Sequence, residues 1–197
     1  MSSEVRFFSP DAPYYKLTSV APCKLYIEGA NYDSVEMYFL TQKFVNHPEY
    51  MSIVSSADSV QKARALAALK TQVGGAMDKW TISIKGQKGP ETRFVNDIIE
   101  RYKKRGVRPR EDWEAVKYGI MLNGLRMKFR QNGEMRDLLL STRDATLIHE
   151  DPKDPYWGIG SNGMGRNMLG ELLERVREEI QEADDGVIVV ETVSVAE

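Results

Sequence analysis

The stretch Asp154-Pro-Tyr-Trp-Gly-Ile-Gly-Ser-Asn-Gly-Met-Gly-Arg-Asn-Met-Leu-Gly170 is the most distinctive part of this 197-residue chain. An acidic residue stands three positions before a tryptophan, and a loop rich in glycine follows. Glycine permits positive φ angles and a close approach of the backbone to a ligand. A helix is predicted to begin at Asn167, and the amide groups at a helix start are a natural seat for phosphate. The stretch predicts a nucleotide or sugar-phosphate site, with a structural loop capped by Asn167 as the alternative.

The composition is that of an ordinary globular protein. A length of 197 residues fits one domain with a sizeable core better than two domains. The single cysteine, Cys23, excludes an internal disulfide and fits a reducing compartment. No run approaches the roughly twenty apolar residues of a membrane span, and the N-terminus lacks a basic segment followed by an apolar one. We therefore expect a cytoplasmic protein without membrane contact.

The charged residues are unevenly distributed along the chain. Residues 79–110 contain ten basic and three acidic residues, whereas residues 178–197 contain seven acidic residues and no basic one. Such asymmetry indicates a polyanionic partner near the middle of the chain, and Lys103, Lys104 and Arg105 are the candidate contacts with nucleic acid. A solvated helix face is the alternative.

The first predicted helix carries two candidate catalytic residues. Asp33 is expected to begin this helix, with Glu36 as its capping-box partner. Glu36 and Lys43 are expected on the same side of the helix, about two turns apart. If these residues take no part in catalysis, Glu36 is a helix-capping residue. Lys43 is then a surface lysine whose aliphatic carbons are partly covered by apolar neighbours.

Periodicity predicts a mostly helical chain with a few strands. The longest predicted helix begins after Asp112 and runs from Trp113 through Phe129, with an apolar stripe of helical period. The other predicted helices cover residues 57–74, 92–105, 135–140 and the segment after the glycine loop. The predicted strands cover residues 24–28, 80–85, 145–148 and, as an edge strand or a loose tail, 186–190.

Three segments in a fixed order resemble the NADAR, or YbiA-like, family. The segments are residues 32–44, residues 110–113 with Met121 and Lys128-Phe129, and residues 154–170. The similarity extends from about residue 7 to residue 177, and the joint pattern is far more specific than any one segment. The resemblance implies a single compact α+β domain, mostly helical with a small sheet, over residues 1–185. Residues 74–108 look like an insertion, and residues 186–197 would form a terminal strand or tail.

The resemblance implies an enzyme that hydrolyses N-glycosidic bonds. Family members are associated with phosphoribosylamino-pyrimidines of riboflavin synthesis and with removal of ADP-ribose from guanine bases. The implied catalytic residues are Glu36, Asp154 and Lys43. The implied substrate contacts are Trp113, Trp157, Gly158, Asn167 and Lys128. Two departures from the family pattern are Thr18-Ser19-Val20, where Ser-Asn-Phe is usual, and Ile148-His149, where Val-Glu is frequent.

The expected chemistry is cleavage of the bond between ribose and a base. Positive charge develops on the ribose C1, and a nearby carboxylate stabilises it while a second group protonates the base or activates water. Glu36 and Asp154 are the candidates, and Lys43 could instead attack the opened sugar as a Schiff-base nucleophile. Trp113 and Trp157 would stack on the base or ribose, although core packing is the commoner fate of a tryptophan.

Several functional alternatives remain open at the level of sequence. We favour ADP-ribose on a nucleic-acid base over the pyrimidine intermediate, because the basic segment offers phosphate contacts. A nucleotide-binding module without catalysis and a nucleic-acid-binding protein are the rivals from other classes. His149 is expected to be a polar core residue. No metal cluster is visible in the sequence, and no cofactor is expected.

Overall fold

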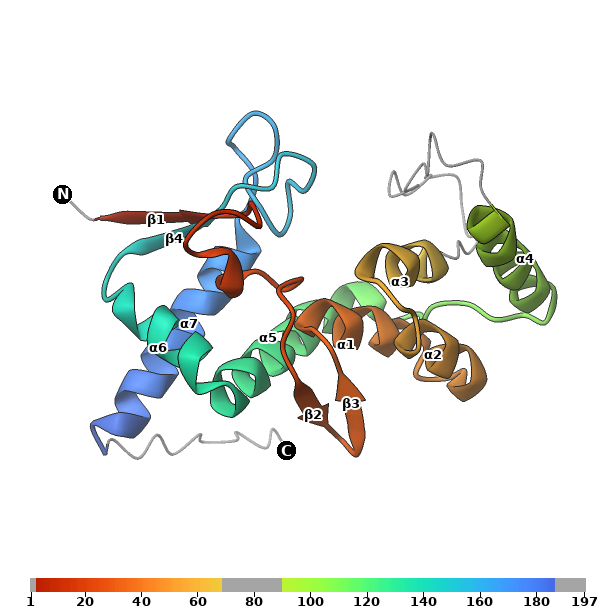
Figure 1. Ribbon diagram of the computed structural model, residues 1–197, viewed down its shortest axis with the longest axis horizontal. Helices are drawn as coiled ribbons and strands as arrows, with labels where there is room; N and C mark the ends of the chain where they lie inside the picture. The colour runs from red at the N-terminus through yellow and green to blue at the C-terminus, as the bar shows by residue number, and fades with distance from the viewer. Residues whose placement is uncertain (1–2, 69–89, 187–197) are drawn as a thin grey trace, which may run out of the picture. The chain divides into compact units, whose positions relative to one another are not determined.

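The computed structural model describes residues 3–68 and 90–186, which form two compact units (Figure 1). The first unit contains the described residues up to Ala21 and those from Lys128 onward, and the second extends from Pro22 to Met127. The mostly helical α+β class expected from the sequence is confirmed. The predicted strand over residues 80–85 lies outside the described residues, as do residues 74–89 of the expected insertion and residues 187–197 of the expected strand or tail. The single domain expected over residues 1–185 stays a prediction.

The first unit is built around a pair of parallel strands backed by a helix. β1 (Glu4–Phe7) pairs with β4 (Thr146–His149), so that Val5 lies opposite Leu147. α7 (Met168–Asp184) packs against β4 through an apolar stripe of buried side chains: Leu169, Leu172, Leu173 and Val176. η1 (Tyr15–Leu17) and α6 (Gly133–Ser141) complete the unit. The apolar period predicted for the last helix is therefore the face that covers the strands (Figure 1).

The second unit is organised around the short helix α1 (Val35–Thr41), in which every residue is buried. A hairpin of β2 (Leu25–Ile27) and β3 (Ala30–Tyr32) precedes α1, and the 3-10 turn η2 (Gln42–Phe44) follows it. α2 (Pro48–Ser55) and α3 (Val60–Ala67) pack on α1 (Figure 1). α4 (Pro90–Lys104) packs on α3. α2 is a helix that the periodicity of the sequence did not predict.

The long helix α5 (Trp113–Gln131) starts in the second unit and lies against α1 there. The contact depends on Gly124, because a Cβ atom at this position would lie 2.8 Å from Cγ1 of Val35 and 3.0 Å from Cδ1 of Tyr38. Asn123 adds a hydrogen bond of 3.0 Å from its Nδ2 to the Tyr38 hydroxyl. The close approach of α5 completes the burial of α1, which carries Glu36.

Candidate active site

The candidate residues divide between the two units. Glu36, Lys43 and Trp113 belong to the second unit, together with the basic residues of α4. Asp154, Trp157, Gly158, Asn167 and Lys128 belong to the first unit. Each unit therefore supplies one carboxylate and one tryptophan. The expectation that both sets surround a single pocket stays a prediction.

Glu36 is a buried carboxylate held by an arginine. Only 8% of Glu36 is exposed, and its Oε1 accepts a hydrogen bond of 2.8 Å from Nε of Arg64 on α3. The expected capping box is wrong, because Ser34 caps α1 and its Oγ accepts the Met37 amide at 3.2 Å. Since the cap is supplied by another residue, the Glu36 side chain is directed to Arg64 rather than to the helix start.

Arg64 is the residue of this site that sequence reasoning missed. It lies on α3 within the run of buried residues Ala63, Ala65, Leu66 and Ala67. A partly exposed arginine in a run of buried apolar residues is unusual, because arginine rarely gives up its water without a partner. That local contrast was the available signal. Its partner, Glu36, is 28 positions away, and no periodic pattern connects two residues at that separation.

Lys43 and Trp113 form a cation–π pair. The Lys43 Nζ lies 5.3 Å from the centroid of the Trp113 ring, which also packs against Phe39 at 4.8 Å. Lys43 belongs to the 3-10 turn η2 rather than to α1, and its carbonyl accepts the Arg110 amide at 2.8 Å. A cation over an aromatic face is stabilised in its charged form, whereas attack on an opened sugar requires the neutral amine.

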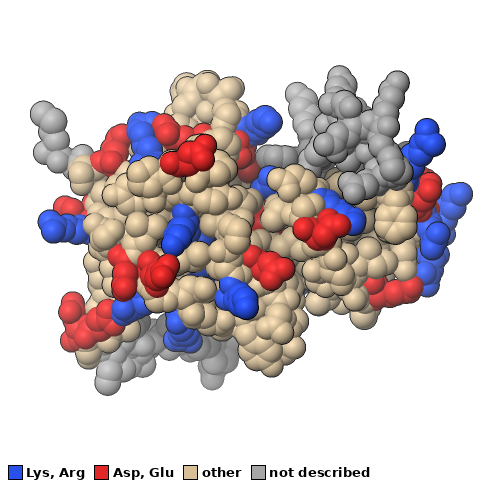
Figure 2. All heavy atoms as spheres, in the orientation of Figure 1, with Lys and Arg blue, Asp and Glu red and all other residues tan. Residues whose placement is uncertain are grey.

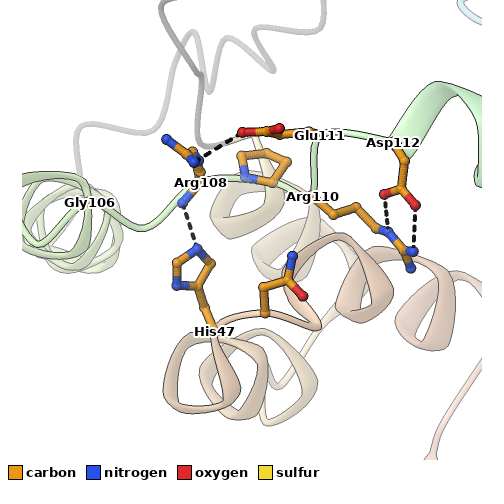
Figure 3. Close-up of a pocket in the computed structure, with 8 residues that line it drawn as sticks. His47, Gly106, Arg108, Arg110, Glu111 and Asp112 are labelled. Carbon is orange, nitrogen blue, oxygen red and sulfur yellow. Dashed lines mark hydrogen bonds and ion pairs between the residues drawn. The ribbon is translucent and has the colours of Figure 1, made fainter.

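A polar groove adjoins this pair within the second unit. It has a volume of about 630 Å³ and is lined by Asn46, His47, Gly106 and residues 108–112 (Figure 3). The Arg108 amide donates to Nε2 of His47 at 3.4 Å, which ties the two walls together. Arg108 is paired with Glu111 at 3.0 Å, and Arg110 with Asp112 at 2.6 Å. The Arg110 amide also bonds the Lys43 carbonyl, so one wall of the groove is joined to the backbone of Lys43.

Asp154 in the first unit organises the loop that contains Trp157. Its Oδ1 accepts the amides of Tyr156 at 2.9 Å and Trp157 at 2.8 Å. Burial raises the pKa of the Asp154 carboxyl above its ordinary value, although these two amide bonds act in the opposite direction. A carboxyl whose pKa is raised holds its proton to higher pH, which suits the role of a general acid.

The glycine loop is packed on itself at the start of α7. The amides of Asn167, Met168 and Leu169 donate to the carbonyls of residues 158, 156 and 157, at 3.0 to 3.1 Å. These amides are used inside the loop, so the helix start does not offer the phosphate seat that the sequence predicted. Gly158 is required by close packing, since a Cβ atom there would lie 2.8 Å from the His149 carbonyl oxygen.

Asn167 has a left-handed backbone and joins α7 to β4 through its side chain. Its φ angle is 53°, and no hydrogen bond from its side chain caps α7. Instead its Oδ1 accepts the His149 amide and its Nδ2 donates to the Leu147 carbonyl, both at 2.8 Å. Asn167 therefore completes the hydrogen bonding of the strand, which differs from the helix cap considered from the sequence.

Lys128 is fully buried in the first unit. Its Nζ donates to the Thr18 carbonyl at 2.7 Å and lies 5.3 Å from the centroid of the Phe129 ring. The Thr18 hydroxyl in turn bonds the Tyr15 carbonyl at 2.8 Å. Lys128 therefore stabilises the segment around Thr18, where the sequence departs from the family pattern. His149 is buried and stacks on Phe7 with ring centroids 5.2 Å apart.

The basic cluster lies on the exposed side of α4. Figure 2 shows lysine and arginine side chains gathered over this helix with fewer acidic ones among them. Lys103 is 3.8 Å from Glu100, and Arg105 binds both carboxylate oxygens of Glu49 at 3.2 and 2.9 Å. Lys104 is exposed. Arg105 thus fastens the end of α4 to α2, while the two lysines face solvent.

Two features were sought in the part of the chain that the structure describes, a metal site and a membrane-spanning helix. In residues 3–68 and 90–186, no group of three or more His, Cys, Asp or Glu residues is arranged to bind a metal ion. Within the same residues, none of the helices combines the length and the apolar character needed to cross a membrane.

Sequence and fold both agree with a known family, and the resemblance seen in the sequence is confirmed. The chain belongs to the NADAR domain family, whose model matches residues 6–181. It is similar to the N-glycosidase YbiA of Shigella boydii serotype 4 (strain Sb227), with 28% identity over 177 residues, 89% of this chain and 88% of that protein. The solved NMR structure of the E. coli protein YbiA has a TM-score of 0.67 and 27% identity, covering 93% of this chain and 88% of that one.

A further relative has a different description. The riboflavin biosynthesis protein VVA0006 of Vibrio vulnificus (strain YJ016) is 28% identical over 182 residues. The match covers 92% of this chain but 40% of that protein. The chain is therefore similar to one part of that larger protein.

Asp154 has a structural role, as acceptor of two hydrogen bonds, and a proposed chemical role as proton donor. Two substitutions at this position separate the two roles. Asn in D154N keeps an oxygen for the two amides but has no carboxyl proton to give. We expect D154N to retain a melting temperature close to that of the parent chain and to lose activity on an N-glycoside substrate by about a hundredfold, the scale of general-acid catalysis. D154A should lose activity and also melt at lower temperature, because two partly buried amides lose their acceptor. Thermal scans and single-turnover rates check this, and full activity in D154N would exclude Asp154 as the acid.

Proposed function

We propose that this chain removes ADP-ribose from guanine bases in nucleic acid by hydrolysing the N-glycosidic bond. The observation that carries the proposal is the buried Glu36 carboxylate with its Arg64 partner, in the same unit as the Lys43–Trp113 pair. The chain is a hydrolase of N-glycosyl bonds, a class supported by relatives named N-glycosidase that match nearly its whole length.

The proposed reaction breaks the bond between the ribose C1 and the base nitrogen. The bonding electrons leave with the base, which receives a proton, and water adds its hydroxyl to C1 and releases a proton. Positive charge on the ribose is greatest between these events, and the Glu36 carboxylate stabilises it. Asp154 is the proposed proton donor, since its pKa is raised by burial. Trp113 and Trp157 would hold the base and the ribose by stacking, worth roughly 1–3 kcal/mol per base.

The choice of a nucleic-acid substrate rests on the surface around α4 and on the polar groove. Lys103 and Lys104 are exposed on α4, and the groove lined by Arg108 and Arg110 adjoins the Lys43–Trp113 pair. The guanidinium groups of the groove are paired with exposed carboxylates, and such surface pairs contribute only about 0–1 kcal/mol. A phosphate can therefore replace a carboxylate at small cost, which supports a path for a nucleic-acid strand.

A second candidate substrate is a phosphoribosylamino-pyrimidine of riboflavin synthesis. The observation in its favour is the similarity to a relative named riboflavin biosynthesis protein. The chemistry at the ribose C1 would be the same, and the substrate would fill only the pocket. Incubation of the protein with both substrates, followed by mass spectrometry, decides between them. We expect release of ADP-ribose from a modified oligonucleotide and slower cleavage of the pyrimidine.

The chemical role of Glu36 is tested by E36Q, which preserves the size of the side chain and removes its charge. We expect hydrolysis to fall by at least about a hundredfold, the scale of losing one electrostatic element of a site. Rates are measured on the better of the two substrates, with circular dichroism as the check of folding. If E36Q turns over substrate as fast as the parent chain does, Glu36 is not a catalytic residue.

The binding of nucleic acid by α4 is tested by the double variant K103E/K104E. Arg105 is left intact, because its hydrogen bonds with Glu49 fasten α4 to α2. We expect a higher KM for a modified oligonucleotide. The logarithmic salt dependence of binding should become shallower by roughly 0.7 for each single-strand phosphate that the variant no longer neutralises. A modified mononucleotide is the matched control, and its KM should not change. If neither substrate responds, the cluster is a solvated helix face.

A further inference from the structure

The contact between Glu36 and Arg64 joins a buried group to one at the edge of the unit. The Glu36 side chain is 11% exposed, whereas the Arg64 side chain is 39% exposed. The carboxylate has thus given up most of its water, and the guanidinium retains part of its own. The atoms Oε1 and Nε are 2.8 Å apart, the distance of a charge-assisted hydrogen bond.

Arg64 is held in place by the local structure of α3. Ser59 caps the helix by accepting the Lys62 amide at 3.3 Å. The next turn is fastened to α2, because the Tyr50 hydroxyl donates to the Leu66 carbonyl at 2.8 Å. The alanines on either side of Arg64 are buried, which fixes the rotation of α3 about its axis. The backbone that carries the guanidinium is therefore packed against both α1 and α2.

A buried carboxylate depends strongly on such a partner. A cation within hydrogen-bond distance compensates part of the lost water and fixes the direction of the carboxylate. Without the hydrogen bond from Arg64, the Glu36 side chain could turn towards solvent and away from the sugar. The guanidinium suits the task because it stays charged at all relevant pH values and donates in a fixed plane.

We propose that Arg64 is the positioning residue of Glu36, whose carboxylate it holds in the orientation that the reaction at the sugar needs. The inference rests on the proposed N-glycosidase function, because it assigns Arg64 a role through the Glu36 carboxylate. Arg64 acts on the rate of the chemical step rather than on the fold alone. Its removal should therefore lower kcat more than it raises KM.

The test is a double-mutant cycle on kcat with the variants R64Q, E36Q and R64Q/E36Q. We expect R64Q to lower kcat by roughly 10–100-fold, the range of one hydrogen bond to a charged group. In the E36Q background no carboxylate remains to be held, so the further loss from R64Q should be under about threefold. R64K should recover part of the rate, since it restores the charge without the planar donor. The control is K62Q on the same helix, which removes the exposed pair of Lys62 with Asp58 and should leave kcat unchanged.

The outcomes separate this inference from the proposed function. The positioning role is overturned if R64Q has the same kcat as the parent chain. It is also overturned if R64Q lowers kcat by the same factor in the parent chain and in E36Q. In both cases E36Q would remain inactive. An active E36Q overturns the role of Glu36 in the proposed function instead. If R64Q alone is too unstable to assay, R64K and the double variant, which buries no unpaired charge, still complete the comparison. R64K equal to the parent chain in rate would show that charge suffices, and R64K as inactive as E36Q, with its fold intact, would show that the planar donor is essential.

Discussion

The second unit depends on keeping one charged carboxylate inside a fully buried helix. All seven residues of α1 are buried, and six of them bring no charge. Glu36 is the exception, and the cost of its desolvation is offset by Arg64 at 2.8 Å. α3 packs on α1 and presents this arginine, and the close approach of α5 at Gly124 covers α1 as well. A helix buried for stability alone would place an apolar residue at position 36.

The first unit uses polar side chains in a different way. Asp154 and Asn167 satisfy backbone groups, and Lys128 bonds the carbonyl of Thr18. Each of these contacts replaces a hydrogen bond that regular secondary structure would have supplied. The glycine loop is consequently held by its own side chains and carbonyls, and these hydrogen bonds determine its shape around Trp157.

The sequence predicted the parts of the structure that follow a short-range rule. The helices containing Phe129 and Leu172 were found because apolar residues recur at the helical period. The helix over residues 48–55 was missed, since eight residues are too few for the helical period to be recognised. The contact of Glu36 with Arg64 was missed because a side-chain partner across 28 residues leaves no periodic trace. The cap was placed at Asp33 instead of Ser34, an error of one residue between two neighbouring capping residues. The phosphate seat was wrong because the partners of its amides are loop carbonyls, which no motif reveals.

The central claim is that Glu36 stabilises positive charge on the ribose as the N-glycosidic bond breaks. The most direct measurement is the secondary deuterium isotope effect at the ribose C1 of an ADP-ribosylated guanine oligonucleotide, obtained by competition between labelled and unlabelled substrate. A ribose that becomes planar and cationic loosens the bending of its C1–H bond, so we predict faster cleavage of the unlabelled substrate. Equal rates for the two substrates would contradict a cationic ribose in the transition state.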